Sequence, residues 1–160
     1  MQIILILSLV AAAIGSGLVA GIFFAFSTFI MTAFSRIPAE QGIAAMNSIN
    51  VTIVRSPFMG LFVPTAILCI VIAVLALIDW RGGASVLMLA GAALYIFASF
   101  LSTIIFNVPM NDALAKVGGN GPEAVQLWTT YVRDWTWWNH VRTIASLLAS
   151  VAFVRALMVV

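Results

Sequence analysis

Charged residues are scarce in this chain. Seven basic and five acidic residues are the only charged groups among 160 residues and make up 8% of the sequence, whereas 64% of the residues are hydrophobic. A soluble domain is about 25% charged and about 45–50% apolar, so this chain has too few charges to cover a water-facing surface. The composition excludes a soluble enzyme and a disordered chain. The basic residues are scattered along the sequence and form no patch for nucleic acid.

Cysteine and histidine each occur once. Cys69 lies within a long apolar run, which excludes a disulfide framework and a cysteine-based metal site. One histidine and five acidic residues in separate segments give no familiar metal-ligand spacing. The sequence also has no Gly-x-Gly-x-x-Gly, P-loop or Gly-x-Ser-x-Gly motif. We therefore expect no metal and no nucleotide cofactor.

The charge-free intervals of the sequence are long enough to cross a membrane. A spanning helix needs about 20 apolar residues, and the mean hydropathy of the chain is +1.18. We expect a single integral membrane domain, 1–160, with spans at about 3–29, 57–78, 84–106 and 138–158. Small residues recur at spacings of three and four in the first and fourth spans, which predicts close helix packing. These residues are Gly17, Gly21, Ala25, Thr28 and Thr32 in the first span and Ala145, Ala149, Ala152 and Ala156 in the fourth.

Four spans place both termini on one side of the membrane and the two long polar segments, 36–56 and 107–141, on the other. The predicted fold is all-α: an antiparallel four-helix transmembrane bundle with an extra short helix in each of the two long loops on one face. Five of the seven basic residues lie at this face: Arg36, Arg55, Lys116, Arg133 and Arg142. The positive-inside rule then predicts that the long loops are cytoplasmic, in a protein of the cell (inner) membrane. Membrane lipids are the expected partners.

Amide and aromatic side chains gather in the same two polar segments. The only histidine and four of the five tryptophans lie there, as do all six asparagines: Asn47, Asn50, Asn107, Asn111, Asn120 and Asn139. Polar loops and interfacial tryptophans explain part of this pattern. However, residues 38–54 form a helical pattern whose apolar face carries two of the amides. Buried amides need hydrogen-bond partners, so this helix is expected to dock on the bundle, through a structural network or around a substrate pocket.

Residues 122–158 can form one long helix with an aromatic stripe that leads to Arg142. The stripe consists of Trp128, Tyr131, Trp135 and Trp138 and continues into the four alanines of the fourth span. Arg142 should therefore point into the bundle, where an arginine is either functional or a structural staple, paired with Asp112 or Asp134 or bonded to carbonyl groups.

His140 lies two residues before Arg142, which places it almost on the opposite side of a regular helix. Asn139 lies much closer to the Arg142 stripe. His140 can join a site around Arg142 only if the helix breaks near Trp137 or if its own side packs against another helix. It is nevertheless the only side chain whose unperturbed pKa lies near neutrality.

Four segments together resemble the anthrone oxygenase-like family of small four-helix membrane proteins, over nearly the whole chain. They are Gly21-Ile-Phe-Phe-Ala-Phe-Ser27, Met46-Asn-Ser-Ile-Asn50, Phe106-Asn-Val-Pro-Met-Asn-Asp112, and Trp128-Thr-Thr-Tyr131 through Trp135-Thr-Trp-Trp-Asn-His-Val-Arg142. The resemblance implies a multi-pass membrane protein. Characterised members of that family oxidise polyketide anthrones to anthraquinones with O2 and without a bound metal or flavin, whereas most bacterial members have no assigned activity.

The resemblance implies a cofactor-independent monooxygenase of a lipophilic anthrone-like or phenolic substrate, with O2 as co-substrate. Such a reaction needs a base, donors for an enolate oxygen, and aromatic walls. The candidate catalytic residues are His140 as base, with Arg142 and Asn139 at the oxyanion. The candidate substrate-binding residues are Asn50, Asn107, Asn111, Asp112, Tyr131, Trp135 and Trp138. If His140 faces away, the base is Asp112, Asp134 or water.

Two other readings remain open: a non-enzymatic module that binds or transports a small molecule, and a purely structural membrane protein. They differ in what the amide cluster should look like. An enzyme needs a roomy cavity in which Arg142 and a base converge. A structural network needs Asn50, Asn107, Asn139 and Arg142 to satisfy one another without a void.

Overall fold

Helices account for nearly all of the described chain. The computed structural model describes residues 2–117 and 121–160, and no strand occurs among them. In chain order the helices, with π-helical segments labelled η, are α1 (Gln2–Ala25), η1 (Phe26–Ile30), α2 (Met31–Phe34), α3 (Ala39–Val54), α4 (Pro57–Ile78), α5 (Gly83–Ala93), η2 (Leu94–Leu101), η3 (Thr103–Asn107), α6 (Val108–Lys116) and α7 (Pro122–Leu157).

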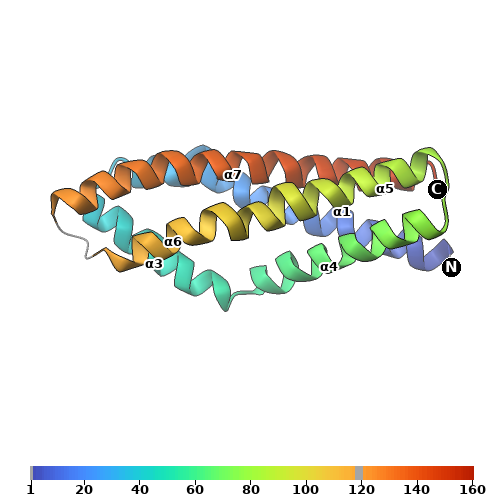
Figure 1. The fold of residues 1–160 in the computed structure, drawn as a ribbon, viewed down its shortest axis with the longest axis horizontal. Helices are drawn as coiled ribbons and strands as arrows, with labels where there is room; N and C mark the ends of the chain where they lie inside the picture. Colours follow the sequence, from blue (N-terminus) through green and yellow to red (C-terminus); the bar gives the residue numbers. More distant parts are fainter. Residues whose placement is uncertain (1, 118–120) are drawn as a thin grey trace.

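Four helical stretches are long and apolar enough to cross a membrane: Gln2–Phe34, Pro57–Ile78, Gly83–Lys116 and Pro122–Leu157. They form an antiparallel bundle, with both termini and the α4–α5 turn at one end and the polar segments at the other (Figure 1). The chain is therefore an integral membrane protein with the expected all-α bundle fold. We call Gln2–Phe34 the first rod and Gly83–Lys116 the third rod.

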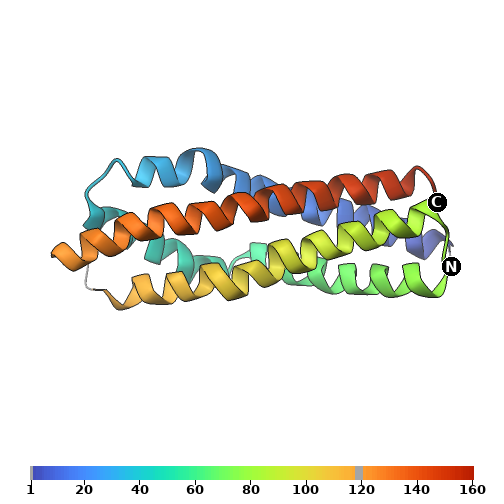
Figure 2. The ribbon, with the colours of Figure 1, turned by 45° about the horizontal axis from the view of Figure 1, so that its top comes forward.

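Three of these stretches exceed the thickness of a bilayer. They contain 33, 34 and 36 residues, and at 1.5 Å per residue each is about 50 Å long, against about 30 Å of hydrocarbon. Their ends project together at the polar end of the bundle, where α3 lies along them (Figure 2). The expected first, third and fourth spans are thus parts of longer helical stretches.

The projecting ends enclose a second hydrophobic core, separate from the core between the spans. Ile43 and Met46 of α3 are buried in it beside Trp128, Tyr131 and other residues of α7. Gly42 lets α3 approach closely, because a Cβ atom at this position would meet Cζ2 of Trp128 at 2.5 Å. This second core fixes α3 across the polar end of the bundle.

The expected short helix of the second polar segment exists as α6, but it is the last part of the third rod and continues directly from η3. Pro109 lies in its first turn and no side chain caps it. Asn111 does not cap it, because its side chain accepts hydrogen bonds from α7. Asn120 lies outside the described residues.

The small-residue stripe is confirmed in the fourth span, whereas in the first span it holds at Gly17, whose Cβ position lies 3.3 Å from Ser150 Oγ, and not at Gly21. Ala145, Ala149, Ala152 and Ala156 are all buried. In the first rod, Gly21 is exposed and nothing approaches its Cβ position. The contact face of α1 instead contains residues such as Ala12 and Ser16, since the apolar sequence leaves the helix rotation undetermined.

Candidate functional site

A cavity of about 640 Å³ lies where α3 and the start of α4 face the other three stretches. Its volume falls within the range typical of small-molecule sites, about 300–1,000 Å³. The aromatic residues that line it are Phe23, Phe26, Phe58, Phe62, Phe100 and Trp135. The polar and charged residues that line it are Asn47, Asn50, Arg55, Thr103, Asn107, Asn111, Asp112 and Arg142. The cavity therefore combines an apolar wall with a concentrated set of amides and one buried cation.

Arg142 is the buried cation, with only 3% of its surface exposed. Nη2 donates a hydrogen bond to Oδ1 of Asn139 (2.7 Å) and Nη1 donates to Oγ1 of Thr103 (3.3 Å). The guanidinium carbon lies 4.3 Å from the ring centroid of Phe23 and 4.9 Å from that of Trp135. No carboxylate of the described residues forms an ion pair with it. The structural staple to an aspartate is therefore not present, and the charge faces the cavity with neutral partners only.

Asn139 holds the guanidinium in place and is itself fully buried. Its Nδ2 donates to the carbonyl oxygen of Phe23 (2.6 Å) and to Oγ of Ser27 (2.7 Å). A carbonyl oxygen can only accept, so Oδ1 of this amide must face Arg142. Asn139 is thus fixed from behind by the first rod and lies outside the cavity lining.

The π-helical segment η1 follows directly on the Asn139 contact. Such turns depart from the i→i−4 ladder and recur at functional sites, and here the interruption comes three residues after the Phe23 carbonyl. Thr143 donates to the carbonyl of Asn139 (2.8 Å), and its Oγ1 lies 3.0 Å from Oγ of Ser27. The first rod and α7 are thus joined by side-chain hydrogen bonds next to the buried arginine.

Asn111 connects the third rod to the aromatic stripe of α7. Its Oδ1 accepts from the hydroxyl of Tyr131 (2.7 Å) and from Nε1 of Trp135 (3.0 Å). Tyr131 is buried behind this amide and does not line the cavity, whereas Trp135 does. An indole N–H can only donate, so Nδ2 of Asn111 remains free to serve as a donor on the cavity side.

Asn107, like Asn139, is oriented by a hydrogen bond to a backbone carbonyl. Its Nδ2 donates to the carbonyl of Trp135 (3.2 Å), which directs Oδ1 elsewhere. That Oδ1 is buried and has no hydrogen-bond partner among the described residues. The amide of Asn47 follows the same pattern, because its Nδ2 donates to the carbonyl of Leu114 (3.5 Å).

Buried polar atoms without a partner concentrate in this cavity. Among the described residues five such side-chain atoms occur. Four of them belong to residues that line the cavity: Asn47 Oδ1, Asn50 Nδ2, Asn107 Oδ1 and Arg142 Nε. Each buried atom left unpaired costs about 1–3 kcal/mol. The amide cluster is therefore not a closed structural network; it surrounds a space with both donors and acceptors unused.

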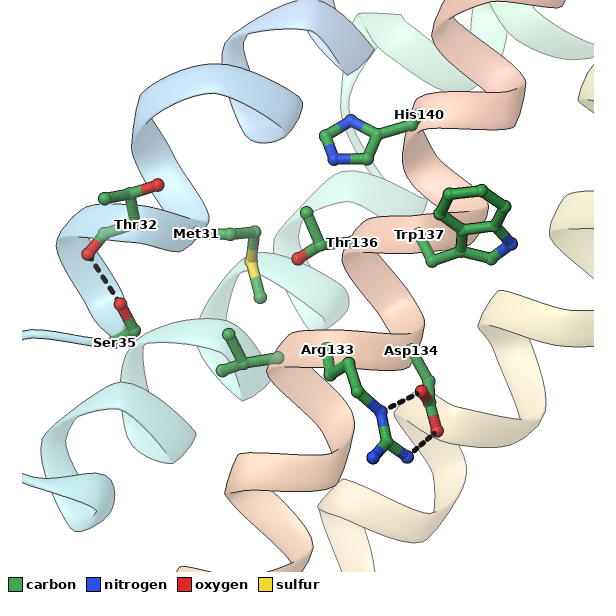
Figure 3. Close-up of a pocket in the computed structure, with 9 residues that line it drawn as sticks. Met31, Thr32, Ser35, Arg133, Asp134, Thr136, Trp137 and His140 are labelled. Carbon is green, nitrogen blue, oxygen red and sulfur yellow. Dashed lines mark hydrogen bonds and ion pairs between the residues drawn. The ribbon is translucent and has the colours of Figure 1, made fainter.

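His140 does not reach this cavity. Helix α7 runs without a break through Trp137, so His140 points to the other side and lines a separate groove of about 490 Å³ between α7 and the first rod. Figure 3 shows His140 and Thr136 facing Met31 and Thr32 across that groove. Asp134 lines the same groove, where it is paired with Arg133 (2.6 Å). Of the three side chains considered as base, only Asp112 lines the cavity of Arg142.

Trp138 is the remaining residue of the expected wall, and it lies outside the cavity lining. Its ring stacks on that of Phe106, with centroids 3.5 Å apart and planes within 5° of parallel. This stack joins α7 to the third rod on the outer side of the bundle.

Several lining residues were not among the expected site residues. Thr103 lies between Ser99 and Asn107 on one helical face, a spacing that also occurs in simple packing stripes. Phe23 belongs to the Gly21–Ser27 segment, whose resemblance alone carries little weight. Phe62 and Phe100 carry no sequence signal beyond hydrophobicity, and only the fold brings their rings together, with centroids 5.1 Å apart.

No group of three or more His, Cys, Asp or Glu side chains suited to a metal ion occurs in the described ranges. The polar side-chain groups around the cavity are amides, a hydroxyl, two guanidinium groups and a single carboxylate.

Comparison with known families gives one finding. The family model described as anthrone oxygenase matches residues 58–152, which is more than half of the chain. The matched part covers α4 from Phe58, the whole third rod and α7 as far as Ala152, but not α1 or α3. The comparisons with curated proteins and with solved structures each give no match.

Proposed function

Because the chain belongs to the anthrone oxygenase family, we propose that it is a cofactor-independent monooxygenase that oxidises a lipophilic anthrone-like or phenolic substrate with O2. The observation that carries this proposal is the buried guanidinium of Arg142, which has no carboxylate partner among the described residues and lines an aromatic cavity. Burying such a charge is costly, and an anionic or strongly polarised ligand oxygen would compensate it.

The reaction requires a carbon acid that becomes an anion. A base removes a proton from the methylene group of the ring system, and the negative charge spreads onto the ketone oxygen to give an enolate. The electron-rich anion transfers one electron to O2, the two radicals combine, and protonation gives a hydroperoxide. Loss of water from the hydroperoxide removes the second methylene hydrogen and breaks the O–O bond. One methylene group and one O2 thus give one ketone and one water.

Arg142 is assigned the role of stabilising the anion. Its Nε has no protein partner among the described residues, and Nη1 is bonded only weakly, to Thr103 at 3.3 Å. Donors fixed in position before the charge develops are the main source of such stabilisation. Asn139 is assigned a positioning role, because it holds Nη2 at 2.7 Å and lies outside the cavity lining.

Asp112 is assigned the role of base, directly or through a water molecule. It is the only carboxylate among the described lining residues, and it lies on α6 at the exposed rim of the cavity. A carboxylate is a weak base toward a carbon acid, so the step depends on the stabilisation that Arg142 gives to the anion. With Asp112 as base and Arg142 stabilising the anion, the reaction needs no contribution from His140.

The unused polar atoms also suggest what kind of ligand fits. Arg142 Nε and Asn50 Nδ2 require an acceptor, whereas Asn107 Oδ1 and Asn47 Oδ1 require a donor. An aromatic ketone that also carries a hydroxyl group offers both. The aromatic lining supplies stacking and edge contacts for its rings.

The test is O2 uptake by the purified protein with 1,8-dihydroxyanthrone, beside the Arg142→Ala variant and a protein-free control. The proposal requires uptake faster than autoxidation and a loss of this excess in the variant. Uptake equal to the protein-free rate, combined with retained binding of the compound, would instead favour the alternative function, a non-enzymatic binding or transport module.

We further propose that the protein lies in the cell membrane with α3 and α6 on the cytoplasmic side, as the distribution of basic residues favours.

A further inference from the structure

The cavity has an opening whose rim is apolar and exposed. Val51 and Val54 on α3 form one side, with 70% and 65% of their surface exposed. Ile104 and Val108 on the third rod form the other side, with 49% and 40% exposed. All four residues line the cavity. We call this feature the α3–η3 opening.

The depth of the opening follows from contacts between the helices. Phe62 of α4 packs on Phe100 of the third rod. Five residues of helix lead from Phe62 back to Pro57, the first residue of α4, and five lead from Phe100 on to Ile105, so Pro57 and Ile105 lie at about the same depth. Pro57 begins α4, whose 22 residues span about 33 Å, close to the thickness of the hydrocarbon core, and Arg55 lies two residues before it, at the end of α3.

An exposed tryptophan marks the same depth on α7. Phe106 stacks on Trp138, so the neighbouring Trp137, with 64% of its surface exposed, lies at about the level of Phe106, next to Ile105 and therefore near the depth of Pro57. Tryptophan is enriched at membrane–water interfaces. The α3–η3 opening therefore lies at the boundary between the hydrocarbon and the headgroup layer, whereas Arg142 lies deeper, beside Thr103.

From this placement we propose that the α3–η3 opening faces the interfacial layer of one lipid leaflet and admits the ligand laterally from the membrane. In water, a rim of exposed valine and isoleucine would be unfavourable, whereas in the leaflet it continues the lipid phase into the aromatic cavity. Arg55 is exposed at this rim without an ion-pair partner among the described residues, in a position suited to lipid phosphate groups. The ligand class, a lipophilic aromatic compound, rests on the proposed function; the orientation of the opening does not.

The first experiment determines which phase the opening faces. Cys69 is the only cysteine and is fully buried, so a Cys69→Ala background permits single labels. A bimane label is placed at Ile104→Cys, with Leu147→Cys in mid-membrane and Thr129→Cys on the projecting end of α7 as controls. In phosphatidylcholine vesicles we expect nitroxide-labelled lipid to quench the Ile104 label as it does the Leu147 label, and iodide to quench only the Thr129 label. Quenching of the Ile104 label by iodide instead of nitroxide overturns the proposal.

The second experiment tests the route. Ile104→Trp narrows the opening, and Leu147→Trp is the control, since it places the same side chain at a lipid-facing position away from the opening. The probe is 1,8-dihydroxyanthraquinone dissolved in the vesicles, and its binding is followed by quenching of protein fluorescence. We expect association and dissociation both to slow by about tenfold in Ile104→Trp, with little change in Kd, because an obstruction changes rates more than affinity. Unchanged rates overturn the route. A probe that does not bind at all contradicts the proposed function, while the label experiment still decides the orientation of the opening.

Discussion

Replacement of Arg142 by methionine removes the guanidinium and keeps an unbranched side chain of good helix propensity. The variant loses the hydrogen bond to Asn139 at 2.7 Å, the weaker one to Thr103 at 3.3 Å, and two cation–π contacts at 4.3 and 4.9 Å. Hydrogen bonds to charged groups contribute about 1.5–3 kcal/mol each, and desolvated cation–π contacts about 2 kcal/mol. Against these stands the cost of burying an unpaired charge, which is several kcal/mol.

These opposing contributions nearly cancel. We therefore expect the free energy of unfolding of the ligand-free protein to change by less than about 2 kcal/mol in Arg142→Met. Catalysis should respond differently, because loss of one preorganised donor to a developing oxyanion lowers kcat by about 10²–10³-fold, or about 2.7–4 kcal/mol. A residue kept for stability alone would show the reverse pattern.

The assay combines O2 uptake with 1,8-dihydroxyanthrone, corrected for autoxidation, with thermal or denaturant unfolding of the same detergent-solubilised samples. His140→Gln serves as the matched control, because His140 lies one turn or less from Arg142 on α7 but faces the other groove. It should retain O2 uptake within about twofold, since it touches no part of the cavity. If Arg142→Met retains normal uptake but unfolds far more easily, the guanidinium is a structural group and the reasoning is refuted. Loss of uptake in His140→Gln would refute the assignment of the base to the cavity side.

Two further variants test how the site is held together. Asn139→Asp would place a carboxylate against Arg142, cancel its charge and remove the donor to the Phe23 carbonyl. We expect O2 uptake to fall by about 10²-fold although Arg142 is retained. Normal uptake would contradict the need for a free cation. Gly42→Ala adds a Cβ that meets Trp128 at 2.5 Å, so we expect a loss of about 1–3 kcal/mol in stability and weaker binding of 1,8-dihydroxyanthraquinone. Gly60→Ala is its control, since nothing lies within 4 Å of the added Cβ, and equal stability in the two variants would show that α3 is not held by this contact.

The number of spans and the all-α class could be predicted because both depend on quantities that a sequence states directly. The length of each charge-free interval can be compared directly with the thickness of the bilayer. The charges at Arg55 and Asp79 delimit the second span without any knowledge of packing. The inward direction of Arg142 was predictable for a similar reason. On a regular helix its position follows from the aromatic stripe and the alanines that share its face.

The lengths of the rods and the rotation of the first span were not predictable in the same way. Polar residues after a span are compatible with a loop or with a helix that continues into water, so 107–116 and 122–137 could be read as either. In the first span nearly every face is apolar, and the choice between the Gly21 face and the Ala12–Ser16 face depends on the partner helices.

The sequence by itself determined that the protein lies in a lipid bilayer and not in water, because hydrophobicity and charge are properties of composition. It also determined which end of the bundle carries the polar groups. Only the tertiary structure decided which of these groups share a cavity. Asp112 and Asn107 of the third rod and Asn50 of α3 line the same cavity as Arg142, whereas His140, two residues from Arg142 in the chain, does not. The physical reason is that helix geometry fixes angles only within one helix. Contacts between helices depend on how side chains from distant segments fill the same space.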